Sequence, residues 1–401
     1  MRVVLIDDKF YFTLYHYMQA QLPLRAFFFK SNMKHIEQTL ISPKGLHSPN
    51  IMQDKNTGKR GLIIGLVVAA LAVGFWFGWQ PLKAIYFSGV PKELADPYVC
   101  IPTGSNFDQV VAILKKQGIV HDEAGFRWLA GQMNYKKDKM RAGRFQVKPG
   151  WNNRELIQHL RNGEQAPVKV ILNNERLPEE VAGVVARFIE ADSLTLLNAF
   201  RNPTTLAELG WTPETLIAGF IPNTYEMYWN TDANGFLQRM KKENTSFWDK
   251  NDRRAKARAL GLTETQVYIL ASIVERETNY NPEKSTIAGV YLNRLKIGMK
   301  LQADPTSVFA TRDFGARRVT EYHTTFDSPY NTYMYKGLPP GPISMAAIPT
   351  IDAVLNYEKH NYLYFCAKPD DTGTHAFAET FAAHKVNADR FQNWVRLTRG
   401  I

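Results

Sequence analysis

The longest apolar run of the sequence lies near its N-terminus. The segment GLIIGLVVAALAVGFWFGW, from Gly61 to Trp79, has no charged residue and no polar stripe on a helical face, and it is about as long as one transmembrane helix. Lysine and arginine precede it and aromatic residues crowd its far end, which places the N-terminus in the cytoplasm and everything after Trp79 outside. We therefore predict a single-pass membrane anchor at 61–79. A cleaved signal peptide is the alternative, although no A-x-A-like site follows closely.

The residues before this run differ from the rest of the chain. Residues 1–51 contain aromatic clusters without helical or strand period, so no domain can be predicted from them. Met52 opens a short polar and basic stretch, 52–60, that leads directly into the apolar run. We interpret Met52 as the start of translation and 52–60 as a short cytoplasmic segment. A genuine cytoplasmic extension over 1–51 is the alternative.

Strand and helix signals alternate from residue 98 to residue 172. Ser105 precedes apolar residues at helical spacing, from Phe107 to Leu114, and can cap that helix. The other elements predicted here are strands at 98–101, 143–147 and 168–172 and a second helix at 153–161. This order of strand, helix, helix and strand resembles a LysM-like module, the unit that binds sugar polymers in many wall proteins.

From residue 173 to residue 398 the pattern is mostly helical. Helices are predicted at 178–191, 193–201, 234–249, 263–278 and 285–295, and a late strand at 362–367. Segment 327–349 is rich in Pro, Gly and Tyr and is expected to be an ordered loop. The predicted fold class is α+β: one transmembrane helix, a small LysM-like module at 98–172, and a mostly helical domain with a few strands at 173–398.

Composition narrows the possible functions. The chain has 401 residues, 45% hydrophobic and 22% charged, the balance of a folded protein of two or three domains. Cys100 and Cys366 are the only cysteines, so a disulfide framework is excluded, although the two could pair in an oxidising compartment. The net charge of +11 suggests an anionic neighbour such as phospholipid, nucleic acid or cell wall. No ligand spacing for a metal occurs, and we expect neither a metal nor a cofactor.

Segment 263–278 predicts a buried helix that ends in acidic residues. Thr263 and Gln266 form a capping-box signature, and apolar residues on nearly every face follow. Glu275 lies at the end of this apolar run, where desolvation would keep a carboxyl protonated near neutral pH and able to donate to a glycosidic oxygen. Glu277 lies about 200° from Glu275 on the helical wheel, so we expect the two not to share one cleft. The alternative for Glu275 is a helix-end glutamate paired with an arginine.

Six further side chains are candidates for binding substrate: Gln302, Asp304, Tyr330, Asn331, Tyr333 and His375. Amide and carboxyl groups can hydrogen-bond sugar hydroxyls, and aromatic rings can stack on sugar rings. Each candidate also has a structural alternative. An aspartate before proline, as at 304, has the form of a helix N-cap. The tyrosines could pack a long loop on the domain, the glutamine could be solvated, and a lone histidine is often structural.

Four motifs occur in a fixed order along the C-terminal part. They are ASIVERET at 271–278, AGVYLNRLKIGMKLQADPT at 288–306, SPYNTY at 328–333 and GLPPGPI at 337–343. Together they resemble the family of membrane-bound endolytic murein transglycosylases, the MltG or YceG-like proteins, over roughly residues 173–384. The single anchor and the LysM-like module fit the layout of that family. Asn223 stands where the family usually has an aspartate, so we assign it no role.

The resemblance implies a lyase that acts on peptidoglycan glycan strands. The catalytic residue is the first glutamate of the VE-x-ET motif, which is Glu275 here. It would protonate the oxygen between N-acetylmuramic acid and N-acetylglucosamine and then take the proton of the muramoyl 6-hydroxyl, leaving a 1,6-anhydro end. The resemblance also implies an inner-membrane protein with a periplasmic catalytic domain that terminates glycan elongation. Its partners would be glycan strands, the lipid bilayer and peptidoglycan synthases.

Two other functions stay open. A non-catalytic peptidoglycan-binding scaffold would need no active carboxyl. A hydrolytic muramidase would need Glu275 together with a held water or a second carboxylate, for which Asp304 is the candidate. Nucleic-acid binding is not expected, because an outward-facing domain would not meet nucleic acid and no basic and aromatic binding motif is apparent.

Overall fold

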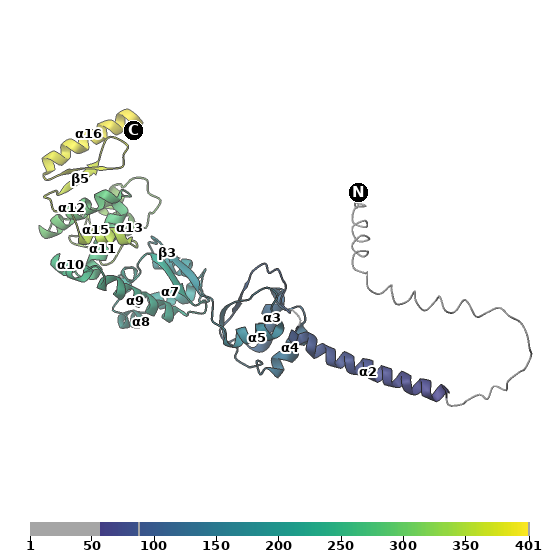
Figure 1. The fold of residues 1–401 in the computed structure, drawn as a ribbon. Coiled ribbons are helices and arrows are strands. Elements are labelled where there is room, and N and C mark those ends of the chain that lie inside the picture. The colour runs from purple at the N-terminus through teal and green to yellow at the C-terminus, as the bar shows by residue number, and fades with distance from the viewer. Residues whose placement is uncertain (1–56, 87–88, 400–401) are drawn as a thin grey trace, which may run out of the picture. The chain divides into compact units, whose positions relative to one another are not determined.

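The N-terminal part of the structure is a single long helix. The computed structural model describes residues 57–86 and 89–399, and the chain divides into two compact units, Met1–Ala72 and Val73–Ile401. Helix α2 (Thr57–Tyr86) begins in the first unit and ends in the second (Figure 1). Within the described ranges, no helix has the length and apolar character that crossing a membrane would need, so the span predicted at 61–79 is not confirmed. The predictions for 1–51 and for Met52 lie outside the described residues.

A first hydrophobic core is formed by buried residues between Val90 and Leu160. It is enclosed by β1 (Tyr98–Ile101), α3 (Phe107–Lys116), α4 (Glu123–Gln132), β2 (Gly143–Gln146) and α5 (Asn153–Asn162), with β1 and β2 antiparallel. The prediction that Ser105 caps the first of these helices is wrong. Ser105 is buried, and the Asn106 side chain accepts the hydrogen bond from the backbone N–H of Gln109 instead.

Strand β3 (Val168–Leu172) belongs with the residues that follow it. It pairs antiparallel with β4 (Asn223–Met227), and Val170 and Leu172 are buried in a second core that extends to Leu355. The side-chain alternation of a strand puts these two residues on one face. The sequence pattern predicts 168–172 as part of the preceding module, because local pattern does not reveal a partner strand so distant in the sequence.

The second core is built mainly of helices. In chain order these are α6 (Pro178–Val185), α7 (Ser193–Arg201), α8 (Pro203–Glu208), α9 (Ala233–Asp249), α10 (Arg253–Ala259), α11 (Glu264–Glu277), α12 (Lys284–Lys296), α13 (Asp304–Thr311), α14 (Glu321–Thr325) and α15 (Ile348–Leu355) (Figure 1). Helix α11 packs against α12, α13 and α15, so every residue from Val267 to Val274 is buried. A helix that is apolar on nearly all faces needs such partners on several sides, and the buried helix predicted at 263–278 is confirmed.

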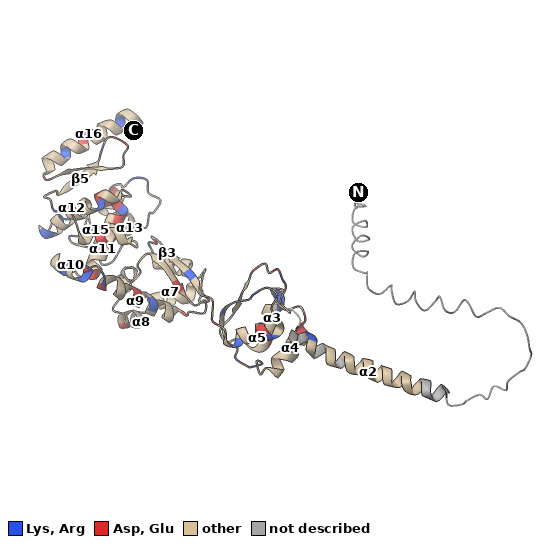
Figure 2. Ribbon diagram, viewed as in Figure 1, with Lys and Arg blue, Asp and Glu red and all other residues tan. Residues whose placement is uncertain are grey.

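The C-terminal residues form a hairpin with a helix packed on it. Strands β5 (Tyr364–Ala367) and β6 (His375–Ala378) are antiparallel, and α16 (Phe381–Arg399) contacts both. Between α14 and α15 the chain has no regular helix or strand, as expected for the Pro- and Gly-rich loop. Short strands among many helices confirm the α+β prediction. Figure 2 shows both basic and acidic residues on the helices of the second core and on α16.

Candidate active site

Helix α11 carries three consecutive polar residues at its C-terminal end into different surroundings. Thr263 is the N-cap, and its hydroxyl and the Gln266 side chain form the predicted capping box. From this start, consecutive residues turn by about 100° each, so Glu275, Arg276 and Glu277 leave the buried segment in three directions. Which of them meets a cavity is decided by the elements packed around the helix end.

Glu275 lies in a buried polar cluster. Its Oε2 atom is 3.0 Å from the ammonium of Lys284, and the hydroxyl of Thr350 donates to the same oxygen. Asn174 donates to Oε1 at 3.3 Å. The side chains of Lys284 and Glu275 are 5% and 10% exposed, so each neutralises a buried opposite charge. The alternative considered from the sequence, an ion-paired glutamate, matches this geometry, with a lysine in place of an arginine.

Glu277 has a different environment from Glu275, although the two residues are only two positions apart on α11. The hydroxyl of Tyr291 donates to its Oε1 atom. Burial raises the pKa of Glu277 to about 7, the hydrogen bond from Tyr291 and the charge of Arg294 oppose this rise, and the charge of Asp304 adds to it. A carboxyl with such a pKa is partly protonated at neutral pH and can both donate and accept a proton.

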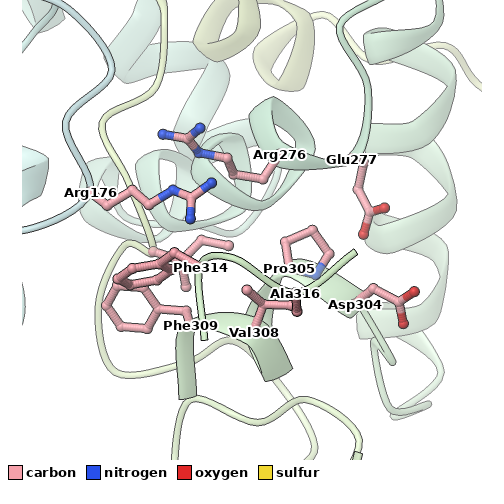
Figure 3. A pocket seen from close by; sticks show the side chains of 10 residues that line it. Arg176, Arg276, Glu277, Asp304, Pro305, Val308, Phe309, Phe314 and Ala316 are labelled. Atoms are coloured by element: carbon pink, nitrogen blue, oxygen red, sulfur yellow. The ribbon is translucent and has the colours of Figure 1, made fainter. Parts of the chain in front are cut away.

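Two cavities meet at Glu277 and Asp304, because both side chains line both spaces. The first, of about 340 Å³, is called the arginine cavity; its other lining residues are Arg176, Arg276, Pro305, Val308, Phe309, Phe314, Ala316 and Ile343. Figure 3 shows the two carboxyl groups on one side of this space and the two arginines on the other. The second, of about 380 Å³, is called the histidine cavity; among its other lining residues are Tyr291, Arg294, Gln302, Tyr333, Tyr364, His375 and His384. Glu275 lines neither of these two cavities.

Asp304 is the second carboxylate of the site. The N-cap interpretation of this residue is wrong, because Ala303 holds the extended N-cap position and Asp304 is already the first residue of α13. Its side chain accepts a hydrogen bond from the hydroxyl of Tyr333. Burial, and then the Asp304 carboxylate, raise the pKa of Tyr333, so its hydroxyl stays protonated and keeps donating.

Four of the six predicted substrate-binding candidates come together at this site. Gln302, Asp304, Tyr333 and His375 all line the histidine cavity. Gln302 has a positive φ of 49°, and such a backbone strain is often found at functional positions. His375 is held by Glu283, whose carboxylate lies 2.8 Å from its Nδ1 atom. Their roles toward substrate stay predictions.

The other two candidates make contacts inside the protein. Asn331 is fully buried, and its amide donates to the backbone carbonyls of His323, Thr324 and Phe326. These contacts hold the loop, and a role of Asn331 toward substrate stays a prediction. The ring of Tyr330 lies 4.8 Å from that of Phe309 and packs against the second core. For both residues the loop-packing alternative matches the structure.

Several lining residues could not be recognised from the sequence. Helical spacing separated Glu277 from Glu275, and no pattern indicated Arg176, Arg276, Tyr291 or Arg294. The helical wheel did show that the two glutamates point apart, and that was the available signal. The helical wheel could not show which of the two glutamates would face a cavity, because that depends on how α13 packs against α11.

The described part of the chain contains no group of three or more His, Cys, Asp or Glu side chains that could hold a metal ion. Cys366 lines the histidine cavity, and it and Cys100 are both free thiols.

The chain has clear relatives among known proteins. It is 26% identical over 308 residues to the endolytic murein transglycosylase of Bacillus subtilis, a match that covers 73% of this chain and 83% of that protein. It is 26% identical over 343 residues to the endolytic murein transglycosylase of Streptococcus pneumoniae, covering 77% of this chain and 61% of that protein. A crystal structure of a YceG-like protein from Listeria monocytogenes matches with 25% identity and a TM-score of 0.49, over 72% of this chain and 97% of that one. The sequence pattern of the YceG-like family matches residues 99–390, and the chain therefore belongs to the YceG-like family.

Proposed function

We propose that this chain is a lytic murein transglycosylase, a lyase that cleaves the bond between N-acetylmuramic acid and N-acetylglucosamine within glycan strands. The observation that carries the proposal is the position of Glu277, in the wall of two cavities, beside a second carboxylate and with a pKa raised to about 7. The names of the relatives from B. subtilis and S. pneumoniae support the same reaction and substrate.

In the proposed reaction Glu277 acts twice. As a carboxylic acid it gives its proton to the glycosidic oxygen, and the bond from that oxygen to C1 of the muramoyl residue breaks. The muramoyl 6-hydroxyl oxygen then forms a bond to C1, and the Glu277 carboxylate takes the hydroxyl proton. A pKa near the working pH suits both steps. No water is consumed, and the product is a 1,6-anhydro end.

Asp304, which lies on the same side of the arginine cavity as Glu277 (Figure 3), is proposed to assist. Its negative charge contributes to the raised pKa of Glu277, which keeps the acid protonated. A fixed carboxylate there would also stabilise the positive charge that develops at C1 in an oxocarbenium-like transition state. The hydrogen bond from Tyr333 fixes its orientation.

Glu275, to which the family resemblance pointed, is the alternative catalytic acid. Its carboxylate faces Lys284 and Thr350 and lines neither of the two cavities described above. We therefore propose a positioning role for Glu275, in which it neutralises Lys284 and fixes the end of α11, while Glu277 exchanges protons with substrate.

The two glutamates are matched controls for each other. Glu277→Gln should lower the cleavage rate by about 10²- to 10⁴-fold, the range typical of a lost general acid and base, and leave the fold intact. Glu275→Gln should retain most of the cleavage activity per folded molecule but lose stability, by roughly 3 kcal/mol for a broken buried ion pair. Mass spectrometry of digested glycan strands and thermal unfolding measure the two effects.

Each result that contradicts this prediction indicates a different catalytic acid or a different function. If Glu275→Gln abolishes cleavage at unchanged stability and Glu277→Gln does not, Glu275 is the acid. Reducing ends in place of anhydro ends would indicate a muramidase that uses Glu277 and Asp304 as its two carboxylates. A wild-type protein that binds strands without cutting them would be a scaffold.

Attachment to the inner membrane through 61–79, with the catalytic part in the periplasm, stays a proposal from the sequence. It rests on the uncharged run and its cationic flank. Fractionation of cells tests it, and recovery of the full chain without detergent would contradict it. Termination of glycan elongation and partnership with peptidoglycan synthases are likewise proposals, which rest on the family resemblance.

A further inference from the structure

The arginine cavity has more positive charge than the cleavage reaction requires. Arg176 and Arg276 lie together on the side opposite Glu277 and Asp304 (Figure 3). Neither guanidinium takes part in a salt bridge with any described residue. Two cations side by side repel each other. Burial and then the charge of Arg176 lower the pKa of Arg276, and the charges of Glu275 and Glu180 only partly oppose this. An anion between them would relieve this repulsion.

The two side chains are held in place with donors still unused. The guanidinium of Arg176 lies over the ring of Phe314, with 4.7 Å from its carbon to the ring centroid. Arg276 donates from Nη2 to the backbone carbonyl of Asn174 at 2.6 Å, but its Nε is buried and has no hydrogen-bond partner among the described residues. Fixed guanidinium forks with free donors match the planar geometry of a carboxylate.

We propose that Arg176 and Arg276 bind a carboxylate of the glycan strand next to the cleaved bond, and so make the enzyme select strands that carry acidic groups. The inference rests on the proposed function, because it assigns the substrate group that occupies the arginine cavity. Two parts of a strand offer this chemistry: the peptide stem, through its own carboxylates, and a muramoyl residue without a stem, through the free carboxylate of its lactyl group.

The selection follows from geometry as well as charge. The arginine cavity ends at the same Glu277 and Asp304 that line the histidine cavity, so a sugar chain bound over the two carboxyl groups would extend into both spaces. A neutral chain would leave the arginines unpaired, whereas an acidic group would satisfy them. Asp304 would repel an acidic group on its own side, which favours binding in one direction along the strand.

The experiment measures kcat and KM for cleavage of strands with intact stems and of strands whose stems have been removed enzymatically, each with the full-length protein. Arg176→Gln should raise KM at least about tenfold, the loss expected for one charged hydrogen bond, with kcat little changed. The difference in KM between wild type and Arg176→Gln should become smaller at high salt, because salt screens the attraction between the arginine and the acidic group. Arg176→Lys keeps the charge but loses the fork, and should lie between wild type and the glutamine variant.

Arg312 provides a matched control. Its guanidinium also lies over a phenylalanine, 4.6 Å from the Phe309 centroid, but it does not line the arginine cavity. Arg312→Gln should leave KM unchanged. Thermal unfolding of all variants separates a folding defect from a binding defect, and Arg276→Lys repeats the test with the backbone contact at Asn174 as its main structural risk.

The two probes identify the source of the carboxylate. A rise in KM confined to stem-bearing strands assigns it to the peptide, and a rise confined to stripped strands assigns it to the lactyl group. Unchanged KM on both probes overturns the proposal. If the wild-type protein cleaves neither, the proposed function fails; binding of the same strands, compared with neutral chitin oligosaccharides, then still tests the arginines. Equal affinity of wild type and Arg176→Gln for all three ligands would overturn the inference.

Discussion

Glu275 and Glu277 differ by two positions on α11 and meet opposite electrostatic surroundings. The first faces the ammonium of Lys284 at 3.0 Å, and the second faces the neutral hydroxyl of Tyr291 and the charge of Asp304. Charge neutralisation suits a structural ion pair, while burial beside a like charge suits a proton donor. These surroundings support the proposed division of roles, in which Glu275 positions the end of α11 and Glu277 exchanges protons with substrate.

From the raised pKa of Glu277 we predict how the stability of the protein changes with pH. Its pKa rises from an ordinary value of 4.5 in the unfolded chain to about 7 in the folded protein. For an acid with a raised pKa, the stabilising contribution is present in full below pH 4.5 and is lost as pH rises through 7. Wild type should therefore lose stability relative to Glu277→Gln over this interval, by roughly 3 kcal/mol.

Denaturant unfolding of both proteins from pH 4 to pH 9 measures this difference, and other titrating groups cancel in the comparison. A constant difference across the range would mean that Glu277 is not perturbed. The same group should make cleavage by wild type fall about tenfold per pH unit above pH 7, as the acid loses its proton.

At the scale of elements, the sequence predicted what depends on local pattern. The capping box at Thr263, the buried run from Val267 to Val274 and the irregular loop before α15 were all recognisable, because spacing and turn residues determine them. The open side of α11 was not, because it depends on the packing of α13 against that helix. For the same reason the sequence pattern could not show that the amide of Asn331 holds the loop from inside.

That loop provides the prediction at this scale. Asn331→Ala removes three hydrogen bonds to loop carbonyls and leaves buried acceptors unsatisfied, which should cost roughly 2–3 kcal/mol. Tyr333 and its contact with Asp304 belong to the same loop, so cleavage activity should fall as well. Thermal unfolding and limited proteolysis around 326–333 measure the effect; an unchanged midpoint and unchanged cutting would show that the loop is held by other contacts. Asn361→Ala, at an exposed position, is the control.

At the scale of the whole molecule, the described residues contain two hydrophobic cores with no residue in common. The first is closed by β1 and β2 and the second begins with the pairing of β3 and β4. The cavities, the two glutamates and the arginine pair all lie among residues of the second. A LysM-like module was predicted over 98–172, but its last strand, β3, packs in the second core. Binding of glycan by the elements around the first core stays a proposal.

Because the two hydrophobic cores share no residue, we expect a mutation that destabilises one core to leave the other core protected. Phe145 is fully buried in the first core, and Phe145→Ala should cost about 3–5 kcal/mol there through lost burial and a cavity. Amide hydrogen exchange should then accelerate in α4 and α5 while α11 and α12 keep their protection, because opening of one cooperative unit need not open the other. Amides of β3 should follow the second core, since β4 is their hydrogen-bond partner. Loss of protection spread evenly over both cores would mean that they unfold as one unit, and faster exchange in β3 together with α5 would place that strand with the first core.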